Sequence, residues 1–198
     1  MKRILNWLGT LLIISGLMLS VWLTNGNAKS DAHQQEMIEA FMSVQTTDGA
    51  PLLTATAEKA VAPDSIDGME GILSIPAIDL ESPVLYGADA ETLNQSLGAI
   101  ENMDLPGEMN GSYAIAGHQA HVFGKHFNRL HEMEVGTKFT LQTVDEEMTF
   151  KVFDIKIVKP HEVEVLEAKK GIALISLITC YPAYSNEYRL VVQGERVD

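Results

Sequence analysis

The pattern of hydrophobic and polar positions divides the 198-residue chain into three parts. Residues 4–23 carry no charged side chain, residues 29–67 are mostly small or polar, and short apolar runs separated by turn residues begin at residue 68. A small, polar stretch such as the middle part buries too little apolar surface to fold alone. We therefore predict a cytoplasmic start and membrane segment at 1–28, an extracellular linker at 29–67 and one folded domain at 68–198.

The hydrophobic segment is long enough to cross a membrane. Its twenty residues, rising about 1.5 Å each in a helix, span roughly 30 Å, the thickness of the hydrocarbon core of a bilayer. Lys2 and Arg3 precede it and no base follows until Lys29, which places the N-terminus in the cytoplasm. A cleavable signal peptide is the alternative, but the apolar run is long for one, and Gly-Asn-Ala at 26–28 is a poor cleavage site. We expect a retained single-pass anchor in the cell membrane and an extracellular body.

The linker contains one amphipathic pattern. Met37, Ile38, Phe41 and Met42 fall at helical spacing and predict a short helix. A plain connection from membrane to domain is one interpretation, and a regulatory arm that packs over the active site is the other.

The domain has the pattern of an all-β fold. Apolar runs broken by prolines at 71–76 and 78–85 predict short strands, because proline is confined to strand ends and edges. A helix is predicted over 89–97, with Asp89 as its N-cap. Further strands are predicted at 112–116, 138–144, 148–158, 173–179 and 188–193. Many short strands with little helix predict a small barrel or a sandwich.

The charge of the chain excludes one class of partner. The formal net charge is −13, from 14 Lys and Arg residues against 27 Asp and Glu residues. Nucleic-acid binding depends on clusters of basic residues that neutralise phosphates, so we expect no nucleic-acid partner.

Three residues at predicted strand ends could carry out acyl transfer. Cys180 is the only cysteine, so it forms no intramolecular disulfide, and it follows an apolar strand; His118 follows another, and Arg189 begins a third. A thiolate is a nucleophile, histidine transfers protons near neutral pH, and arginine stabilises an oxyanion. Each residue also has a structural explanation: a buried small hydrophobe, a histidine at a strand end and a surface charge.

The strings around these residues resemble the sortase family of cysteine transpeptidases. Ala-Gly-His at 116–118, Leu-Ile-Thr-Cys at 177–180 and the downstream Arg189 match its motifs in order and spacing. Gly-Ile-Leu-Ser-Ile-Pro at 71–76 and Phe-Asn-x-Leu at 127–130 extend the resemblance, which covers about residues 71–197.

The resemblance implies an eight-stranded β-barrel with short helices. It also implies a substrate, surface proteins cleaved between Thr and Gly of a Leu-Pro-x-Thr-Gly-like (LPxTG-like) sorting signal, and an acceptor, an amine of cell-wall peptidoglycan. By the same resemblance Cys180 is the nucleophile, His118 the general acid and base, and Arg189 the oxyanion or substrate-holding residue. Thr179 is then a residue that contacts the sorting peptide. The envelope would be of the Gram-positive type.

The subclass and the metal content rest on weaker patterns. The N-terminal anchor and the Glu-Val-Glu-Val-Leu segment at 162–166 resemble class A enzymes, whereas Tyr-Pro at 181–182 resembles class D, and we favour class A. Some class A members bind calcium through acidic loop residues. The candidate oxygen ligands here are Glu101, Asp104, Glu108 and Glu164. Their spacing matches no strong calcium pattern, so we assign no metal or cofactor.

Two other classes of protein compete with this interpretation. His118, His121, His126 and His131 could bind zinc in a metallohydrolase, but their intervals of three, five and five fit no established zinc motif. An anchored domain that only binds a wall component is the second alternative, and it leaves the single cysteine unexplained.

Overall fold

The computed structural model describes residues 7, 13–16, 18, 32–43, 68–119 and 126–198. The chain forms two units, Met1–Glu36 and Met37–Asp198. Most of the predicted anchor at 4–23 and of the linker lies outside the described residues. Within the described residues, no helix has the length and hydrophobicity needed to cross a membrane.

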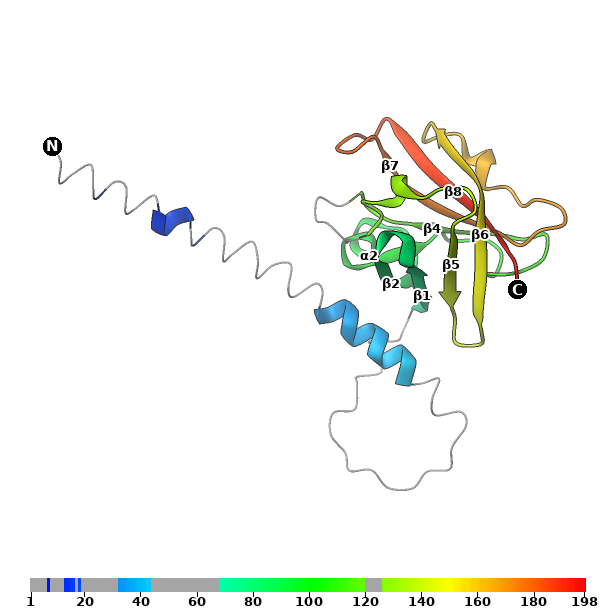
Figure 1. Cartoon of the computed structure of the whole chain (residues 1–198), viewed down its shortest axis with the longest axis horizontal. Helices are drawn as coiled ribbons and strands as arrows, with labels where there is room; N and C mark the ends of the chain where they lie inside the picture. Colours follow the sequence, from blue (N-terminus) through cyan, green and yellow to red (C-terminus); the bar gives the residue numbers. More distant parts are fainter. Residues whose placement is uncertain (1–6, 8–12, 17, 19–31, 44–67, 120–125) are drawn as a thin grey trace, which may run out of the picture. The chain divides into compact units, whose positions relative to one another are not determined.

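Eight strands close into a barrel, which confirms the expected all-β fold (Figure 1). Around the barrel the order is β1-β2-β3-β4-β7-β8-β6-β5. The bounds are β1 Met69–Ile75, β2 Leu80–Tyr86, β3 Leu97–Ala99, β4 Ser112–Ala116, β5 Lys138–Gln142, β6 Glu147–Val158, β7 Leu174–Tyr181 and β8 Tyr188–Arg196. In the described connections between the strands lie one α-helix, α2 Ala90–Gln95, and three short 3₁₀ helices, η2 Pro76–Ile78, η3 Leu130–Glu132 and η4 Val163–Leu166.

The core fills the inside of the barrel with alternate side chains of each strand. Period-two alternation sends Tyr113 and Ile115 of β4, and Ile175 and Leu177 of β7, into one buried cluster. Phe139 and Phe150 of the paired strands β5 and β6 stack in the same cluster, with ring centroids 5.7 Å apart. The same alternation leaves a second series of side chains on the outer face.

The sequence pattern predicts no strand at β3, because it extends the preceding helix to residue 97. Asp89 does cap α2, because its carboxylate accepts hydrogen bonds from the backbone N–H groups of Glu91 and Thr92. The helix nevertheless ends at Gln95, and the next residues pair in parallel with β2. Gly98 allows this pairing, since a Cβ atom there would lie 2.3 Å from the carbonyl oxygen of Gly87.

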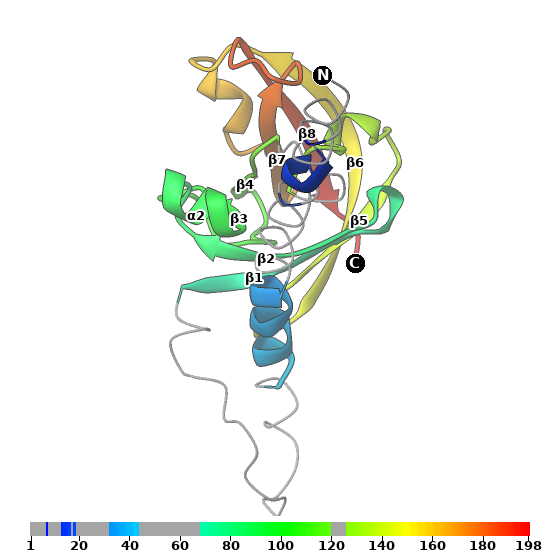
Figure 2. The same cartoon turned by 90° about the vertical axis from the view of Figure 1, so that its left-hand side faces the viewer.

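The helical residues 37–43, which belong to the second unit, place two apolar side chains against the barrel. Met37 and Phe41 are buried in a cluster with Met69 and Ile72 of β1. In the closed order of strands, β1 and β2 lie across the barrel from β7 and β8, an arrangement visible in Figures 1 and 2.

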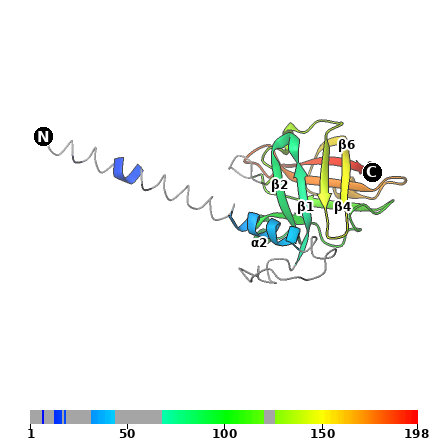
Figure 3. The ribbon, with the colours of Figure 1, turned by 60° about the horizontal axis from the view of Figure 1, so that its bottom comes forward.

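Ion pairs of Arg196 lie at the end of the barrel where β5 turns into β6. Arg196 of β8 binds the carboxylate of Glu146 in the β5–β6 hairpin through Nη1 and Nη2, at 2.9 and 2.6 Å. Its Nε donates to Asp198, whose other oxygen accepts from the backbone N–H of Thr149. The C-terminal residues are therefore fastened to this hairpin, whose strands β5 and β6 are labelled in Figure 1; Figure 3 shows the barrel with β6 and the C-terminus labelled.

Arg129 joins the segment that precedes η3 to the turn between β1 and β2. Its Nη1 donates to the backbone oxygen of Ile78 at 3.0 Å and to Asp79 at 2.9 Å. Its Nε and Nη2 hold the carboxylate of Glu132 at 3.0 and 2.8 Å. Hydrogen bonds from Arg129 lower the pKa of Glu132 below its ordinary value of 4.5.

We predict that Arg129→Met lowers the melting temperature, and by more at pH 7 than at pH 3. The folded-state pKa of Glu132 is depressed, so its stabilising contribution is present above about 4.5 and is lost as the pH falls through the folded value. Thermal unfolding followed by circular dichroism at both pH values measures this difference. Lys138→Met, which removes an exposed cation elsewhere, should show no such pH dependence; an equal loss at both pH values would contradict the prediction.

Candidate active site

The candidate site lies on the outer face of three adjacent strands, β4, β7 and β8. Because Ile115, Leu177 and Leu190 point into the core, their neighbours point outward. The outward series are Ala114 and Ala116 of β4; Ser176, Ile178 and Cys180 of β7; and Arg189, Val191 and Gln193 of β8. The side chains of Cys180 and Arg189 therefore lie on the outside of the barrel.

The strand register brings the three predicted catalytic residues to the same edge of the sheet. Cys180 is directly paired with Arg189 across the antiparallel β7–β8 ladder. On the other side of β7, Ala116 pairs with Ile178 in the parallel β4–β7 ladder. His118 follows Ala116 by two residues, as Cys180 follows Ile178, so His118 comes just past the end of β4 at the edge of the sheet where Cys180 lies. Cys180 is thus paired with an arginine on one side, and a histidine follows the strand on its other side.

His118 is held at the end of β4 by backbone hydrogen bonds. The N–H of Gly117 donates to the carbonyl of Ile178 at 3.0 Å, which continues the ladder past the last strand residue. The carbonyl of His118 accepts from the N–H of Phe127 at 3.1 Å. Phe127 is fully buried, and a Cβ atom at position 117 would lie 2.6 Å from its ring. Glycine is therefore required there, because the chain turns directly over an aromatic ring.

Arg189 is oriented by the loop between β7 and β8. Its Nη1 donates to the carbonyl oxygens of Asn186 and Tyr188 at 3.2 and 3.0 Å. Within the described part of the chain, Nε and Nη2 have no hydrogen-bond partner. The guanidinium is thus fixed on one edge and keeps donors for a substrate oxygen.

Thr179 has a different environment from the other three predicted residues. It is 3% exposed, and its Oγ1 donates to the carbonyl of Gly117 at 2.8 Å. The hydroxyl therefore joins β7 to the residue immediately before His118. Cys180, by contrast, is partly exposed and His118 is exposed.

Beyond Cys180 and Arg189, the outer face of β4, β7 and β8 carries apolar side chains in the first row of paired residues and polar side chains in the second. Ala116 and Ile178 are partly exposed, and Val191 beside them is buried. One register step further, Ser176 and Gln193 are completely buried. Ala116, Ile178 and Val191 therefore form an apolar row between the candidate catalytic residues and the fully buried Ser176 and Gln193.

The metal candidates do not assemble into a site within the described residues. There, no three His, Cys, Asp or Glu side chains lie close enough to hold an ion. The rings of His118 and His126 meet edge to face at 6.4 Å, and His131 contacts the carbonyl of Asn128. His121 lies outside the described residues. Of the candidate calcium ligands, Asp104 accepts a hydrogen bond from the backbone N–H of Ser112.

Two supporting residues were not recognised as such from the sequence. The sequence shows Phe127 only as part of a motif. In the structure its ring lies under Gly117, and its N–H donates to the carbonyl of His118. Gln193 was included only as the end of a predicted strand. Its complete burial follows from a loop folded over β8, for which the local pattern holds no signal.

Comparison with known proteins identifies the family to which this barrel, with its Cys, His and Arg residues, belongs. Residues 73–197 match the sortase domain. The chain belongs to the sortase family, whose members are cysteine transpeptidases.

Individual relatives cover most of the chain. Sortase D of Bacillus subtilis is 28% identical over 94% of this chain and 96% of its own length. Sortase A of Bacillus anthracis is 29% identical over 84% of this chain and 74% of its own length. The crystal structure of sortase C1 from Streptococcus agalactiae superimposes with a TM-score of 0.64, at 28% identity, over 83% of this chain and 89% of that structure. These matches spread over several sortase classes, so they define the family and leave the class open.

Thr179→Val should lower both stability and turnover. The substitution keeps the shape of the side chain but leaves the buried carbonyl of Gly117 without its donor, at a cost of about 1–3 kcal/mol in the free energy of unfolding. Urea unfolding and peptide-cleavage kinetics measure the two effects. Thr179→Ser retains the hydroxyl and should restore most of the turnover; if serine and valine behave alike, the hydrogen bond does not position His118.

Proposed function

We propose that this protein is a transpeptidase that anchors surface proteins to the cell wall, with His118, Cys180 and Arg189 as its catalytic residues. It cleaves a Leu-Pro-x-Thr-Gly-like sorting signal between Thr and Gly and transfers the threonyl carbonyl to an amine of peptidoglycan. The observation that carries the proposal is the register in which Cys180 pairs with Arg189, with His118 just past the end of the neighbouring strand β4. Family membership supplies the type of reaction.

In the first half-reaction the Cys180 thiolate attacks the threonine carbonyl carbon. The carbonyl oxygen gains negative charge, and Nε and Nη2 of Arg189 are the donors placed to bind it. His118 gives a proton to the departing glycine nitrogen as the C–N bond breaks. The products are a thioester on Cys180 and a free amine.

In the second half-reaction the acceptor amine attacks the thioester. His118, now neutral, takes the proton from the incoming nitrogen, and the sulfur leaves as the thiolate. A new amide bond joins the surface protein to the cell wall, and both side chains return to their starting protonation states. The exposed position of His118 lets it reach both the leaving and the arriving amine.

For Thr179 we propose a positioning role in place of the peptide contact that the sequence suggests. Its hydroxyl is donated to Gly117, and its side chain is buried. The residue would act through the placement of His118.

We also propose a single-pass membrane protein with its catalytic domain, residues 68–198, outside the cell in a Gram-positive type envelope. Support comes from the uncharged run at 4–23 and the basic residues before it. A membrane anchor would hold the enzyme where surface-protein precursors emerge and where peptidoglycan precursors carry their amines.

The test is transfer by the full-length chain from a Leu-Pro-x-Thr-Gly peptide to an amine acceptor, followed by mass spectrometry. We expect a threonyl–amine product and a thioester adduct on Cys180. Cys180→Ala should give neither, because no other cysteine can form the thioester. Transfer that survives in Cys180→Ala would exclude the proposed mechanism.

Arg189→Lys should lower kcat by roughly 10²–10³-fold, the effect typical of losing one oxyanion donor. Lysine keeps the charge but cannot reproduce the planar guanidinium, which is held by two carbonyls while it presents other donors. Steady-state cleavage of the sorting peptide gives kcat, and the rate of Cys180 alkylation by iodoacetamide reports on the thiol separately. A kcat within twofold of wild type would remove Arg189 from the mechanism.

A further inference from the structure

A second histidine, His126, lies beside the ring of His118. The two ring centroids are 6.4 Å apart, and the rings meet edge to face with an interplanar angle of 72°. Aromatic rings prefer this arrangement, because the edge of one ring is partly positive and the face of the other partly negative. His126 is buried, with 9% of its surface exposed, whereas His118 is exposed. The contact therefore joins a buried ring to the candidate general acid and base.

The backbone next to His126 is bonded directly to His118. The N–H of Phe127 donates to the carbonyl of His118 at 3.1 Å, and the fully buried ring of Phe127 packs close under Gly117. His126 itself has a φ of 50°, in the left-handed region that histidine, asparagine and aspartate enter more often than most residues. The chain at this position therefore has little freedom to move the ring of His126 away from His118.

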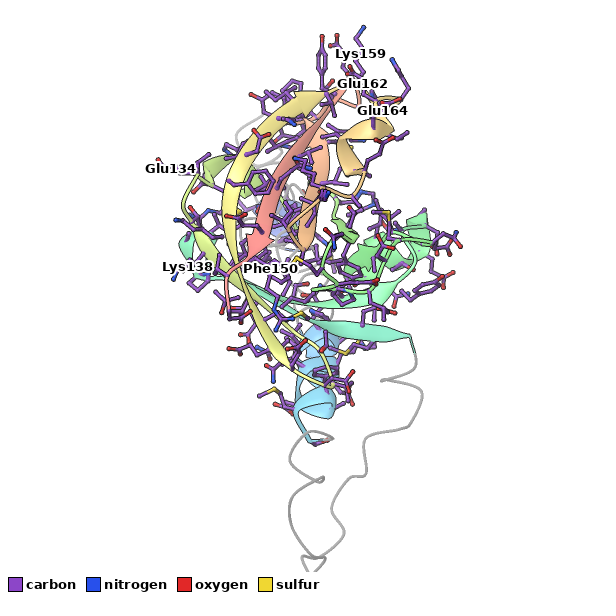
Figure 4. The ribbon with its side chains drawn as sticks, turned by 90° about the vertical axis from the view of Figure 1, so that its right-hand side faces the viewer. Glu134, Lys138, Phe150, Lys159, Glu162 and Glu164 are labelled. Atoms are coloured by element: carbon purple, nitrogen blue, oxygen red, sulfur yellow. The ribbon has the colours of Figure 1, made fainter. Side chains whose placement is uncertain are left out.

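The imidazole of His118 is not oriented by a hydrogen bond. Within the part of the chain that the structure describes, neither of its ring nitrogens has a hydrogen-bond partner. A catalytic histidine is commonly oriented by a third group, such as a carboxylate that accepts from its second nitrogen. Figure 4 shows Glu162 and Glu164, in the loop after β6, projecting outward, and Glu162 accepts from the backbone N–H of Lys159 in the same loop. The contact with His126 is thus in a position to restrict rotation of the His118 side chain.

The orientation of His118 matters because this side chain serves two amines in succession. In the proposed reaction it protonates the departing glycine nitrogen and later takes a proton from the acceptor amine. Both transfers require an imidazole nitrogen close to the carbonyl carbon that is bound to Cys180, and rotation about the Cα–Cβ bond would move that nitrogen away. A neighbouring ring that favours one rotamer raises the fraction of enzyme ready for proton transfer without touching the substrate.

We propose that His126 is a positioning residue whose buried ring holds the imidazole of His118 in the orientation from which it transfers protons at Cys180. This inference rests on the proposed function. His126 acts through the aromatic contact and does not touch the reacting atoms, so another flat ring of similar size should replace it. Loss of the ring should lower kcat and leave binding of the sorting peptide intact.

The test compares His126→Asn and His126→Phe with wild type in the full-length chain. Asparagine also adopts a left-handed φ, so it keeps the backbone and removes the ring. We expect kcat for peptide transfer to fall roughly three- to tenfold, the rate equivalent of one aromatic contact, while KM changes less than twofold. Phenylalanine keeps a ring without nitrogen atoms and should retain kcat within about twofold of wild type. An equal loss in both variants would overturn the proposal, as would an unchanged kcat in His126→Asn.

A matched control removes a different histidine from the same segment. The ring of His131 is exposed and contacts the carbonyl of Asn128, so His131→Asn should leave kcat unchanged. Rates are compared per folded enzyme, with the folded fraction taken from thermal unfolding, because phenylalanine fits a left-handed φ less well than asparagine. A loss of kcat in His131→Asn equal to that in His126→Asn would contradict a specific role of the His126 ring.

Nuclear magnetic resonance tests the ring contact independently of activity. The chain has six histidines, and the Cε1–H signal of His118 is the one that disappears in His118→Gln. Because the ring current of His126 acts on this signal, we expect it to shift in His126→Asn and to stay in place in His131→Asn. An unchanged signal in His126→Asn would overturn the contact, and this measurement also decides if His126→Phe does not fold. If wild type transfers no sorting peptide, the proposed function fails by itself, whereas the His118 signal still reports on the contact.

Discussion

The parallel pairing of β4 with β7 is the constraint on which the site depends. Because these strands run in the same direction, both end at the same edge of the barrel, and the residue that follows each strand is presented there. The antiparallel β8 then starts at that edge, beside the end of β7. A shift of one residue in either ladder would turn Cys180 inward or separate it from its neighbours.

The fold reinforces this register from both sides of the barrel wall. On the inside, Phe127 packs beneath Gly117 and leaves no room for a side chain at that position. On the outside, the buried amide of Gln193 connects the β6–β7 loop to β8. The polar interactions near the site are thus mostly between side chains and backbone carbonyls. They fix where the chain runs, and they leave the side chains of His118, Cys180 and Arg189 partly or fully exposed.

The sequence predicted seven of the eight strands and placed Cys180 and Arg189 at strand ends, because these features are encoded locally. A lone cysteine after an apolar run and an arginine at the start of another identify strand ends without any tertiary information. The burial of Thr179 also agrees with a local pattern. Its place between two outward-facing neighbours in β7 already predicts an inward side chain. The three-residue strand β3 and the burial of Gln193 could not be predicted, since each depends on segments distant in the sequence.

An active site on the outside of the barrel, as we propose for His118, Cys180 and Arg189, would keep the residues that stabilise the fold apart from the residues that bind substrate. The apolar side chains of the core point inward, and the candidate site residues Cys180 and Arg189 point outward from the same strands. Substitutions can therefore accumulate on one face with little effect on the packing of the other. A scaffold of this kind can change its substrates over evolutionary time while its core stays intact, which agrees with a shared fold at identities of only 25–28%.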